Sequence, residues 1–280
     1  MPSLASDAPI GIFDSGIGGL TVAHAVSRAL PHERIHYFGD TAHMPYGDRS
    51  PELVRTWSTR IAEHLLKAGC KAVVIACNSA STTAASDVSR VVGPAVPVVD
   101  VVRPVVKAVA EGAWQRVGVI GTRATIGSGV YGQALRAAMM ANGKIGEVKE
   151  WATPLLAPLI EEGWHDHDLM VPVMESYLQA AGWHLNGPEA IDALIPGCTH
   201  YPLAIDALRR VLGENIALID GPSIVAKEVG HQLETNGLMA LPRDPVRHRF
   251  AVSDLTASFA KSAERFFGSG IDLQADSIWG

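Results

Sequence analysis

The sequence has few aromatic residues, few cysteines and no long apolar run. Aromatic residues make up 6% of its 280 residues while 48% are hydrophobic, so aliphatic side chains supply most of the apolar surface, as in buried parallel strands. The net charge is -6, without a basic patch interleaved with aromatic residues, so we expect no nucleic-acid partner. No stretch approaches the roughly 18 apolar residues of a membrane span, and the first ten residues lack a secretory pattern. We therefore expect a soluble protein with no membrane partner.

Only three cysteines are present: Cys70, Cys77 and Cys198. They are too few and too widely spaced for a disulfide framework, and free thiols are typical of reducing compartments, so we expect a cytoplasmic protein. No pair has the spacing of metal ligands, and we expect no metal site. Cys70 lies in a helix-to-strand turn and is interpreted as structural.

Short β-branched runs alternate with segments of helical periodicity along the chain. Each run ends in a loop rich in glycine or small polar residues. This alternation predicts crossover units, a mostly parallel sheet and an α/β fold. Strands are expected at 10–13, 35–38, 72–76, 96–99, 117–120, 193–195 and 217–219, and the clearest helices at 20–30, 51–68, 129–141 and 202–212.

The two halves of the chain are weakly similar to each other. The run at 10–13 with its glycine loop resembles the run at 117–120 with its Gly-Thr loop, and a later strand in each half ends at Cys77 or at Cys198. We expect two similar lobes, each a mostly parallel sheet flanked by helices, with the active site in the cleft between them. The first lobe is predicted at 1–100 plus 218–280 and the second at 101–217, because Asp220 and the helix after it resemble another unit of the first sheet. Ligands of such sheets bind at the carboxyl ends of the strands.

Cys77 is expected to end a strand and open a helix. Backbone N–H groups and the helix dipole at that position stabilise a thiolate, which can act as a nucleophile or a base. A buried cysteine that packs as a small hydrophobic residue is the alternative, and position alone does not decide between them.

Cys198 has the same placement at a strand end, with His200 two residues later. The imidazole could exchange a proton with the thiol or with a substrate. Taken alone, the pair also fits a Cys-His hydrolase.

Two carboxylates, Asp14 and Asp40, also follow expected strands. Asp14 precedes Gly-Ile-Gly-Gly, a loop whose N–H groups can hold an anion, but the spacing is not that of a dinucleotide-binding loop and Asp14 would repel a phosphate. A small substrate with an ammonium group and carboxylates fits better, and a helix N-cap is the structural alternative. Glu161 is followed by a second glutamate, a pattern typical of a solvated helix end.

Further motifs occur in order from about residue 10 to residue 230. They are GIFDSGIGGL at 11–20, YFGD at 37–40, PYG at 45–47, ACN at 76–78, GT at 121–122 with AT at 124–125, and GCTHYPL at 197–203. As an ordered set they resemble the glutamate racemases, within the cofactor-independent aspartate/glutamate racemase superfamily.

The resemblance implies a cofactor-independent reaction that uses two bases. It also implies that the product D-glutamate is supplied for peptidoglycan synthesis, and that the protein is a homodimer, as members of the family often are. By the family pattern Cys77 acts on the D-enantiomer with help from Asp14, and Cys198 acts on the L-enantiomer with help from His200. Asp40 and Glu161 match positions that tune these groups. The residues that match the polar shell around the amino acid, besides Asp14 and His200, are Ser15, Tyr46, Gly47, Asn78, Ser79, Thr122, Thr125 and Thr199.

Three single positions, and to a lesser degree the segment 220–222, depart from the family pattern. Ser79 stands where threonine is more frequent, Arg103 where an acidic residue is common, and Thr153 where a cysteine is frequent. We expect neither Arg103 nor Thr153 to contact the two catalytic cysteines, although either could alter interlobe packing, the dimer contact or regulation. Three alternatives to glutamate racemisation stay open: racemisation of another amino acid such as aspartate, a Cys-His hydrolase, and an amino-acid-binding protein without catalysis.

Overall fold

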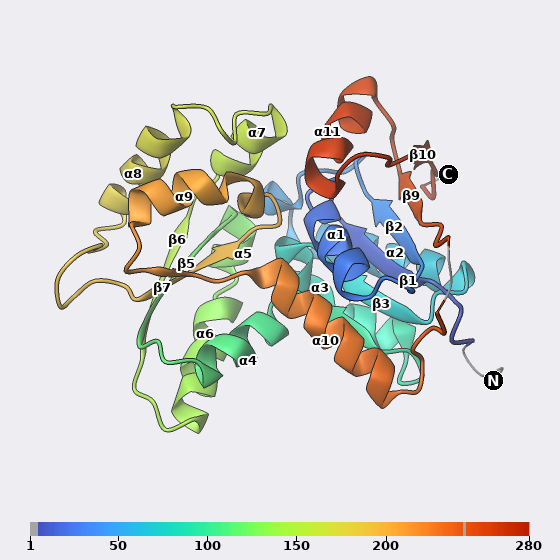
Figure 1. Ribbon diagram of the computed structural model, residues 1–280, viewed down its shortest axis with the longest axis horizontal. Coiled ribbons are helices and arrows are strands. Elements are labelled where there is room, and N and C mark those ends of the chain that lie inside the picture. Colours follow the sequence, from blue (N-terminus) through green and yellow to red (C-terminus); the bar gives the residue numbers. More distant parts are fainter. Residues whose placement is uncertain (1–4, 243–244, 280) are drawn as a thin grey trace.

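Two parallel β-sheets form the framework of the protein (Figure 1). A computed structural model describes residues 5–242 and 245–279. The larger sheet has the strand order β10-β9-β2-β1-β3-β4 and the smaller has β6-β5-β7-β8, and all neighbouring strands are parallel. The strands of the larger sheet are β1 (Ile10–Asp14), β2 (Ile35–Gly39), β3 (Ala72–Ile75), β4 (Val98–Asp100), β9 (Arg249–Val252) and β10 (Leu273–Ala275); those of the smaller are β5 (Arg116–Gly121), β6 (Glu147–Ala152), β7 (Ala193–Gly197) and β8 (Ala217–Leu218). The expected α/β fold with two mostly parallel sheets is confirmed.

The two sheets repeat one topology. Strands β1 to β4 lie in the order β2-β1-β3-β4, and strands β5 to β8 lie in the equivalent order β6-β5-β7-β8. The weak similarity between the halves of the sequence therefore has a structural counterpart. Cys77 follows β3 and Cys198 follows β7, so the two cysteines occupy equivalent positions.

Helices cover both faces of each sheet. They are α1 (Leu20–Ala29), α2 (Pro51–Lys67), α3 (Asn78–Val92), α4 (Arg103–Glu111), α5 (Arg123–Gly127), α6 (Val130–Ala141), α7 (Leu156–Glu161), α8 (Met170–Ala180), α9 (Ile205–Leu212), α10 (Gly221–Thr235) and α11 (Ala257–Phe267), with 3-10 turns at Tyr46–Asp48 and Tyr201–Ala204. No helix among the described residues is both long and apolar enough to cross a membrane.

The alternation of side chains along each strand separates the core of the larger sheet into two layers. Ile12 and Tyr37 pack into the layer beneath α1 and α10, whereas their neighbours Phe13 and Phe38 pack into the layer beneath α2 and α3. Successive residues of a strand point to opposite faces, and both faces of this parallel sheet are covered, which explains its continuously apolar strands.

A buried ion pair also stabilises the larger lobe. Lys71, which directly precedes β3, lies 2.5 Å from the Glu33 carboxylate, and both side chains are almost fully buried. The Lys71 ammonium also donates to the carbonyl oxygen of Leu238 at 2.7 Å. Buried charges persist when they are paired and hydrogen-bonded in this way.

All seven strands expected from the sequence are present, but three others were missed. Strand β6 is an edge strand with charged, half-exposed residues. Strands β9 and β10 are only four and three residues long, too short to show a clear pattern. The segment expected as a helix at 202–212 begins as a 3-10 turn and becomes α9 at Ile205. The chain passes from β8 of the smaller sheet into α10, which packs on α1, and then into β9 of the larger sheet. The exact lobe boundaries, at 100/101 and 217/218, stay predictions.

Candidate active site

The two cysteines at equivalent strand ends line one cavity. Its volume is about 70 Å³, and its walls include Cys77 from one lobe and Cys198 from the other. Larger hollows elsewhere in the described part of the chain, of about 710, 470 and 460 Å³, contain neither cysteine. The remaining wall residues are Asp14, Ser15, Gly16, Met44, Pro45, Tyr46, Gly47, Asn78, Ser79, Thr122, Ala157, Pro158, Glu161, Thr199 and His200. The cavity therefore unites, from both lobes, most of the residues selected from the sequence.

Cys77 is the N-cap residue of α3, as its position in the sequence suggested. Its sulfur accepts a hydrogen bond from the backbone N–H of Ala80 at 3.4 Å and donates to the Ser15 hydroxyl at 3.6 Å. Burial and the negative charge of Asp14 nevertheless raise the pKa of the Cys77 thiol to about 12. The local helix N-terminus is thus outweighed by desolvation, and Cys77 is protonated at neutral pH.

Asp14 ends β1 and is held by the glycine loop that follows it. One carboxylate oxygen accepts hydrogen bonds from the N–H groups of Gly16 at 3.2 Å and Gly19 at 2.9 Å. Burial raises the pKa of Asp14, while the charge of His200 and these backbone bonds oppose the increase. A side chain at position 19 would place its Cβ 2.6 Å from that of Asp14, so the close approach of loop and carboxylate requires glycine there.

On the other side of the cavity, Cys198, His200 and Glu161 form a chain of polar contacts. The Cys198 sulfur lies 3.6 Å from Nδ1 of His200, and Nε2 of the same ring lies 2.8 Å from the Glu161 carboxylate. Burial alone would lower the pKa of His200, but the hydrogen bonds and charges of Cys198 and Glu161 raise it well above its usual value. The imidazole is therefore held in its cationic form beside the Cys198 sulfur.

The Cys198 side of the cavity also packs closely against the first lobe. A Cβ at Gly18 would lie 2.4 Å from the His200 ring, so the glycine loop lies directly against that imidazole. The Thr21 hydroxyl donates to the carbonyl oxygen of Thr199 at 3.0 Å. The glycine loop thus contacts both halves of the site, through Asp14 and through His200.

Hydroxyl groups connect the lobes along another wall. The Ser79 hydroxyl lies 3.0 Å from that of Thr122 and 3.4 Å from that of Thr125. Thr125 does not line the cavity; it is fully buried behind the other two. Asn78 is fixed from the second lobe, because the Tyr131 hydroxyl donates to its side-chain oxygen at 2.8 Å. Serine at position 79 thus supplies the hydroxyl contacts expected there.

Asp40 is fully buried and lies behind the cavity wall. Its carboxylate accepts hydrogen bonds from the Tyr46 hydroxyl at 2.7 Å, the Ser253 hydroxyl at 2.8 Å and the Trp279 indole N–H at 2.8 Å, and it contacts His43 at 3.0 Å. Tyr46 and Gly47 are wall residues. Asp40 therefore positions Tyr46, and we describe it as a positioning residue.

Several wall and supporting residues were missed in the sequence. Trp279 and Ser253 are 239 and 213 residues away from the carboxylate that they contact, and no local pattern signals such distant partners. Tyr131 was missed for the same reason. Met44, which directly precedes the motif at 45–47, could have been found from it, and Pro45 belongs to that motif but was not selected as a site residue.

Thr153 and Arg103, two departures from the family pattern, lie outside the cavity wall. Thr153 is buried, and its hydroxyl lies 2.7 Å from the Tyr201 hydroxyl. Arg103 is on the surface and pairs with Asp100 at 3.0 Å.

Each of the two lobes thus delivers a thiol and an ionisable partner to one cavity, an arrangement that can place proton-transfer groups on two sides of a bound molecule. The sequence matches the family model described as Asp/Glu/Hydantoin racemase over residues 20–229, and the chain belongs to this family. It is 40% identical to a glutamate racemase of Beutenbergia cavernae, over 98% of this chain and 94% of that protein.

Solved structures give the same result. A glutamate racemase from Francisella tularensis subsp. tularensis SCHU S4 in complex with D-glutamate superposes with a TM-score of 0.87 at 33% identity, and 98% of each chain is covered. A glutamate racemase from Thermus thermophilus in complex with beta-chloro-D-alanine has a TM-score of 0.85 at 38% identity, again over 98% of each chain. The family resemblance stated from the motifs is confirmed.

Proposed function

We propose that this protein is a glutamate racemase that interconverts L- and D-glutamate without a cofactor, by proton transfer through two cysteines. The observation that carries the proposal is that Cys77 and Cys198, from topologically equivalent strand ends in different lobes, line the same cavity. Inversion of a stereocentre by proton transfer requires an acid and a base on opposite faces of the carbon. The similarity to glutamate racemases over almost the whole chain supports glutamate as the substrate.

In the L-to-D direction, the Cys198 thiolate removes the α-proton of L-glutamate. The electron pair of the C–H bond remains on the substrate as a carbanion conjugated with its carboxylate. The Cys77 thiol then donates its proton to the opposite face, which gives D-glutamate and a Cys77 thiolate. The raised pKa of Cys77 fits the role of acid in this direction.

The His200 cation supports the base on the other side. Its ring lies next to the Cys198 sulfur, where it can exchange a proton with that group, and Glu161 holds the imidazole in place. In the reverse direction the thiol of Cys198 becomes the proton donor, and the Cys77 thiolate must form despite its burial. An ammonium group of the substrate near Asp14 would offset the charge that opposes this thiolate.

The intermediate must be stabilised by fixed dipoles, since the proposed reaction uses no electron-sink cofactor. Hydroxyl groups of Ser15, Ser79 and Thr122 line the cavity and can hold the substrate carboxylates. The small volume of the cavity favours exclusion of water, which strengthens these interactions. Supply of D-glutamate to peptidoglycan, a homodimeric state and a cytoplasmic location remain predictions from the resemblance.

A substrate panel tests the function. The purified protein is incubated with L-glutamate, D-glutamate or L-aspartate in the absence of added pyridoxal phosphate and metal, and optical rotation is followed. Rotation of either glutamate solution should decay to zero, with aspartate unchanged. Decay with aspartate alone would refute the glutamate assignment and leave the family assignment intact.

Two variants separate the proposal from a Cys-His hydrolase. Cys77→Ser and Cys198→Ser should each abolish racemisation, because each removes one of the two proton-transfer groups. Cys70→Ala is the matched control, since Cys70 is a buried thiol outside the cavity. Full activity of Cys77→Ser would contradict the two-base mechanism.

A further inference from the structure

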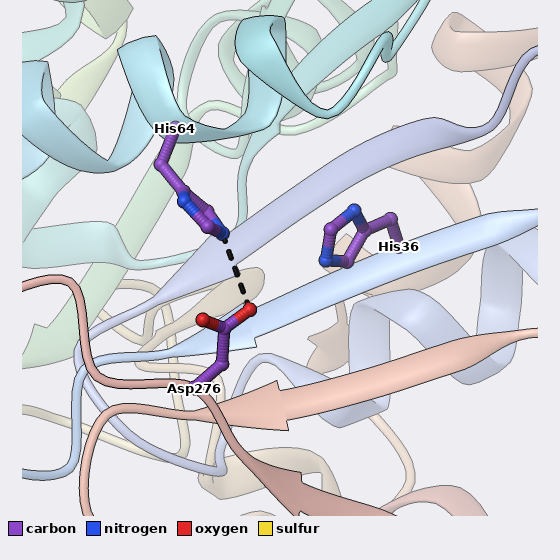
Figure 2. Close-up of side chains that lie close together, drawn as sticks. All are labelled: His36, His64 and Asp276. Carbon is purple, nitrogen blue, oxygen red and sulfur yellow. Dashed lines mark ion pairs between the residues drawn. The ribbon is translucent and has the colours of Figure 1, made fainter.

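A second cluster of polar side chains lies in the larger lobe, outside the cavity. It contains His36 from β2, His64 from α2 and Asp276, which follows β10 (Figure 2). His36 is the second residue of its strand, whereas the candidate active site lies beyond the carboxyl end of that strand. None of the three side chains lines the cavity that contains the two cysteines.

The three side chains offer one ligand atom each within a small volume. These atoms all lie within 4.8 Å of one another. Nε2 of His64 and an oxygen of Asp276 are 3.4 Å apart, which matches the separation of about 3.4 Å between two ligands held about 2.1 Å from a tetrahedral zinc ion.

His36 is the most informative member of the cluster. Its side chain is 3% exposed, and its Nε2 atom has no hydrogen-bond partner among residues 5–242 and 245–279. The other ring nitrogen, Nδ1, lies 4.0 Å from the Cys70 sulfur. A buried imidazole nitrogen without a partner is costly, and a metal ion would satisfy it.

We propose that His36, His64 and Asp276 bind one zinc ion. Two imidazole nitrogens and one carboxylate oxygen form a ligand set that zinc accepts, with a fourth position for water. The side chains of His64 and Asp276 are 25% and 20% exposed, so an ion can enter from solvent and a water molecule can complete the shell. The site was not expected from the sequence, because its ligands come from three distant segments.

One cation already neighbours the cluster. Nη2 of Arg249 lies 2.8 Å from the same Asp276 oxygen that contacts His64. The Arg249 side chain is half-exposed and can turn into solvent, so it orients the carboxylate in the ion-free state without closing the site. Phe38 packs against the His64 ring, with centroids 5.4 Å apart, and limits its rotation.

Zinc at this position would fasten the C-terminal segment to α2 and β2. Asp276 is three residues before Trp279, whose indole N–H donates to Asp40 behind the active site. The proposed ion therefore has a structural role, distinct from the proton transfers of the proposed racemase reaction.

Isothermal titration calorimetry with zinc sulfate tests the proposal. The parent protein carries Cys77→Ser and Cys198→Ser, so that the cavity thiols cannot bind the metal, and it is stripped with a chelator before titration. We expect one zinc ion per chain, and His64→Ala and Asp276→Asn should each weaken binding at least about tenfold. Both positions are partly exposed, and circular dichroism verifies that the variants are folded.

The controls are His184→Ala and Asp272→Asn, which change exposed residues of the same types outside the cluster. They should bind zinc as the parent does. Titration of the parent with cobalt gives a second readout, since cobalt bound by nitrogen and oxygen ligands absorbs visible light. Absence of one-to-one binding by the parent, or equal binding by the parent, His64→Ala and Asp276→Asn, would overturn the proposal.

Discussion

Cys77 should remain a thiol up to strongly alkaline pH in the ligand-free protein. Burial and the Asp14 carboxylate raise its pKa from an ordinary 9.0 to about 12. Three pKa units correspond to about 4 kcal/mol against the thiolate. At pH 10 an ordinary thiol would be about 90% ionised, whereas Cys77 should be about 1% ionised.

The assay is the ultraviolet absorbance of the thiolate between pH 7 and pH 10. Cys70→Ala with Cys198→Ser leaves Cys77 as the only thiol, and the same chain with Cys77→Ser is subtracted to remove tyrosine absorbance. No thiolate signal should develop below pH 10. Addition of Asp14→Asn removes the second cause of the raised pKa and should move ionisation to lower pH. A midpoint at or below 9 in the chain with Asp14 intact would refute the reasoning.

Three other substitutions test separate parts of the structure. Glu161→Gln should lower the pKa of His200, which an NMR titration of the ring would detect. A histidine with a raised pKa contributes stability below its unfolded pKa of about 6.5 that is lost as the pH rises through its folded pKa. The unsubstituted protein should thus have a higher free energy of unfolding than Glu161→Gln, and this difference should shrink at alkaline pH. A difference that does not change with pH would count against the ion pair between His200 and Glu161. Trp279→Phe removes an N–H donor from the fully buried Asp40 carboxylate, and the free energy of unfolding measured in urea should fall by about 1.5–3 kcal/mol. A fall below about 0.5 kcal/mol would mean that the bond is dispensable. Lys71→Met leaves Glu33 buried without its cation and should cost about 3–5 kcal/mol, whereas adding Glu33→Gln should recover part of that loss; no recovery would indicate that packing of the lysine stem dominates.

The sheet framework could be predicted because parallel strands buried on both faces are continuous apolar runs. The runs at 10–13, 72–76 and 117–120 end in polar loops, and each is a central strand. Strand β6 escaped detection because an edge strand needs no apolar run, and its charged residues resemble a loop. Tertiary pairing, which local patterns do not contain, determines such strands.

The cysteines, Asp14 and His200 could be selected from their positions at strand ends and from the motifs around them. The effect of these groups on one another's pKa could not be predicted from the sequence. Position at a helix N-terminus suggested a stabilised thiolate at Cys77, but desolvation and Asp14 have the larger effect. Burial is a property of the packed lobes and cannot be estimated from a strand-end pattern.

Supporting contacts were the least predictable part of the site. Asp40 was selected, yet its role became clear only through Trp279, which reaches it from the C-terminal segment. The cluster of His36, His64 and Asp276 has the same origin, since β2, α2 and the end of β10 meet only in the folded sheet.

The most direct test of the two-cysteine account is the position of solvent deuterium early in the reaction. L-glutamate is incubated with the protein in D2O, and the α-positions of both enantiomers are analysed after a few per cent conversion. The account predicts that the D-glutamate formed carries deuterium at its α-carbon, because the Cys77 thiol has exchanged with solvent, while the remaining L-glutamate keeps its proton. D-glutamate that retains the original proton would show that one group removes and returns it, and would contradict the account.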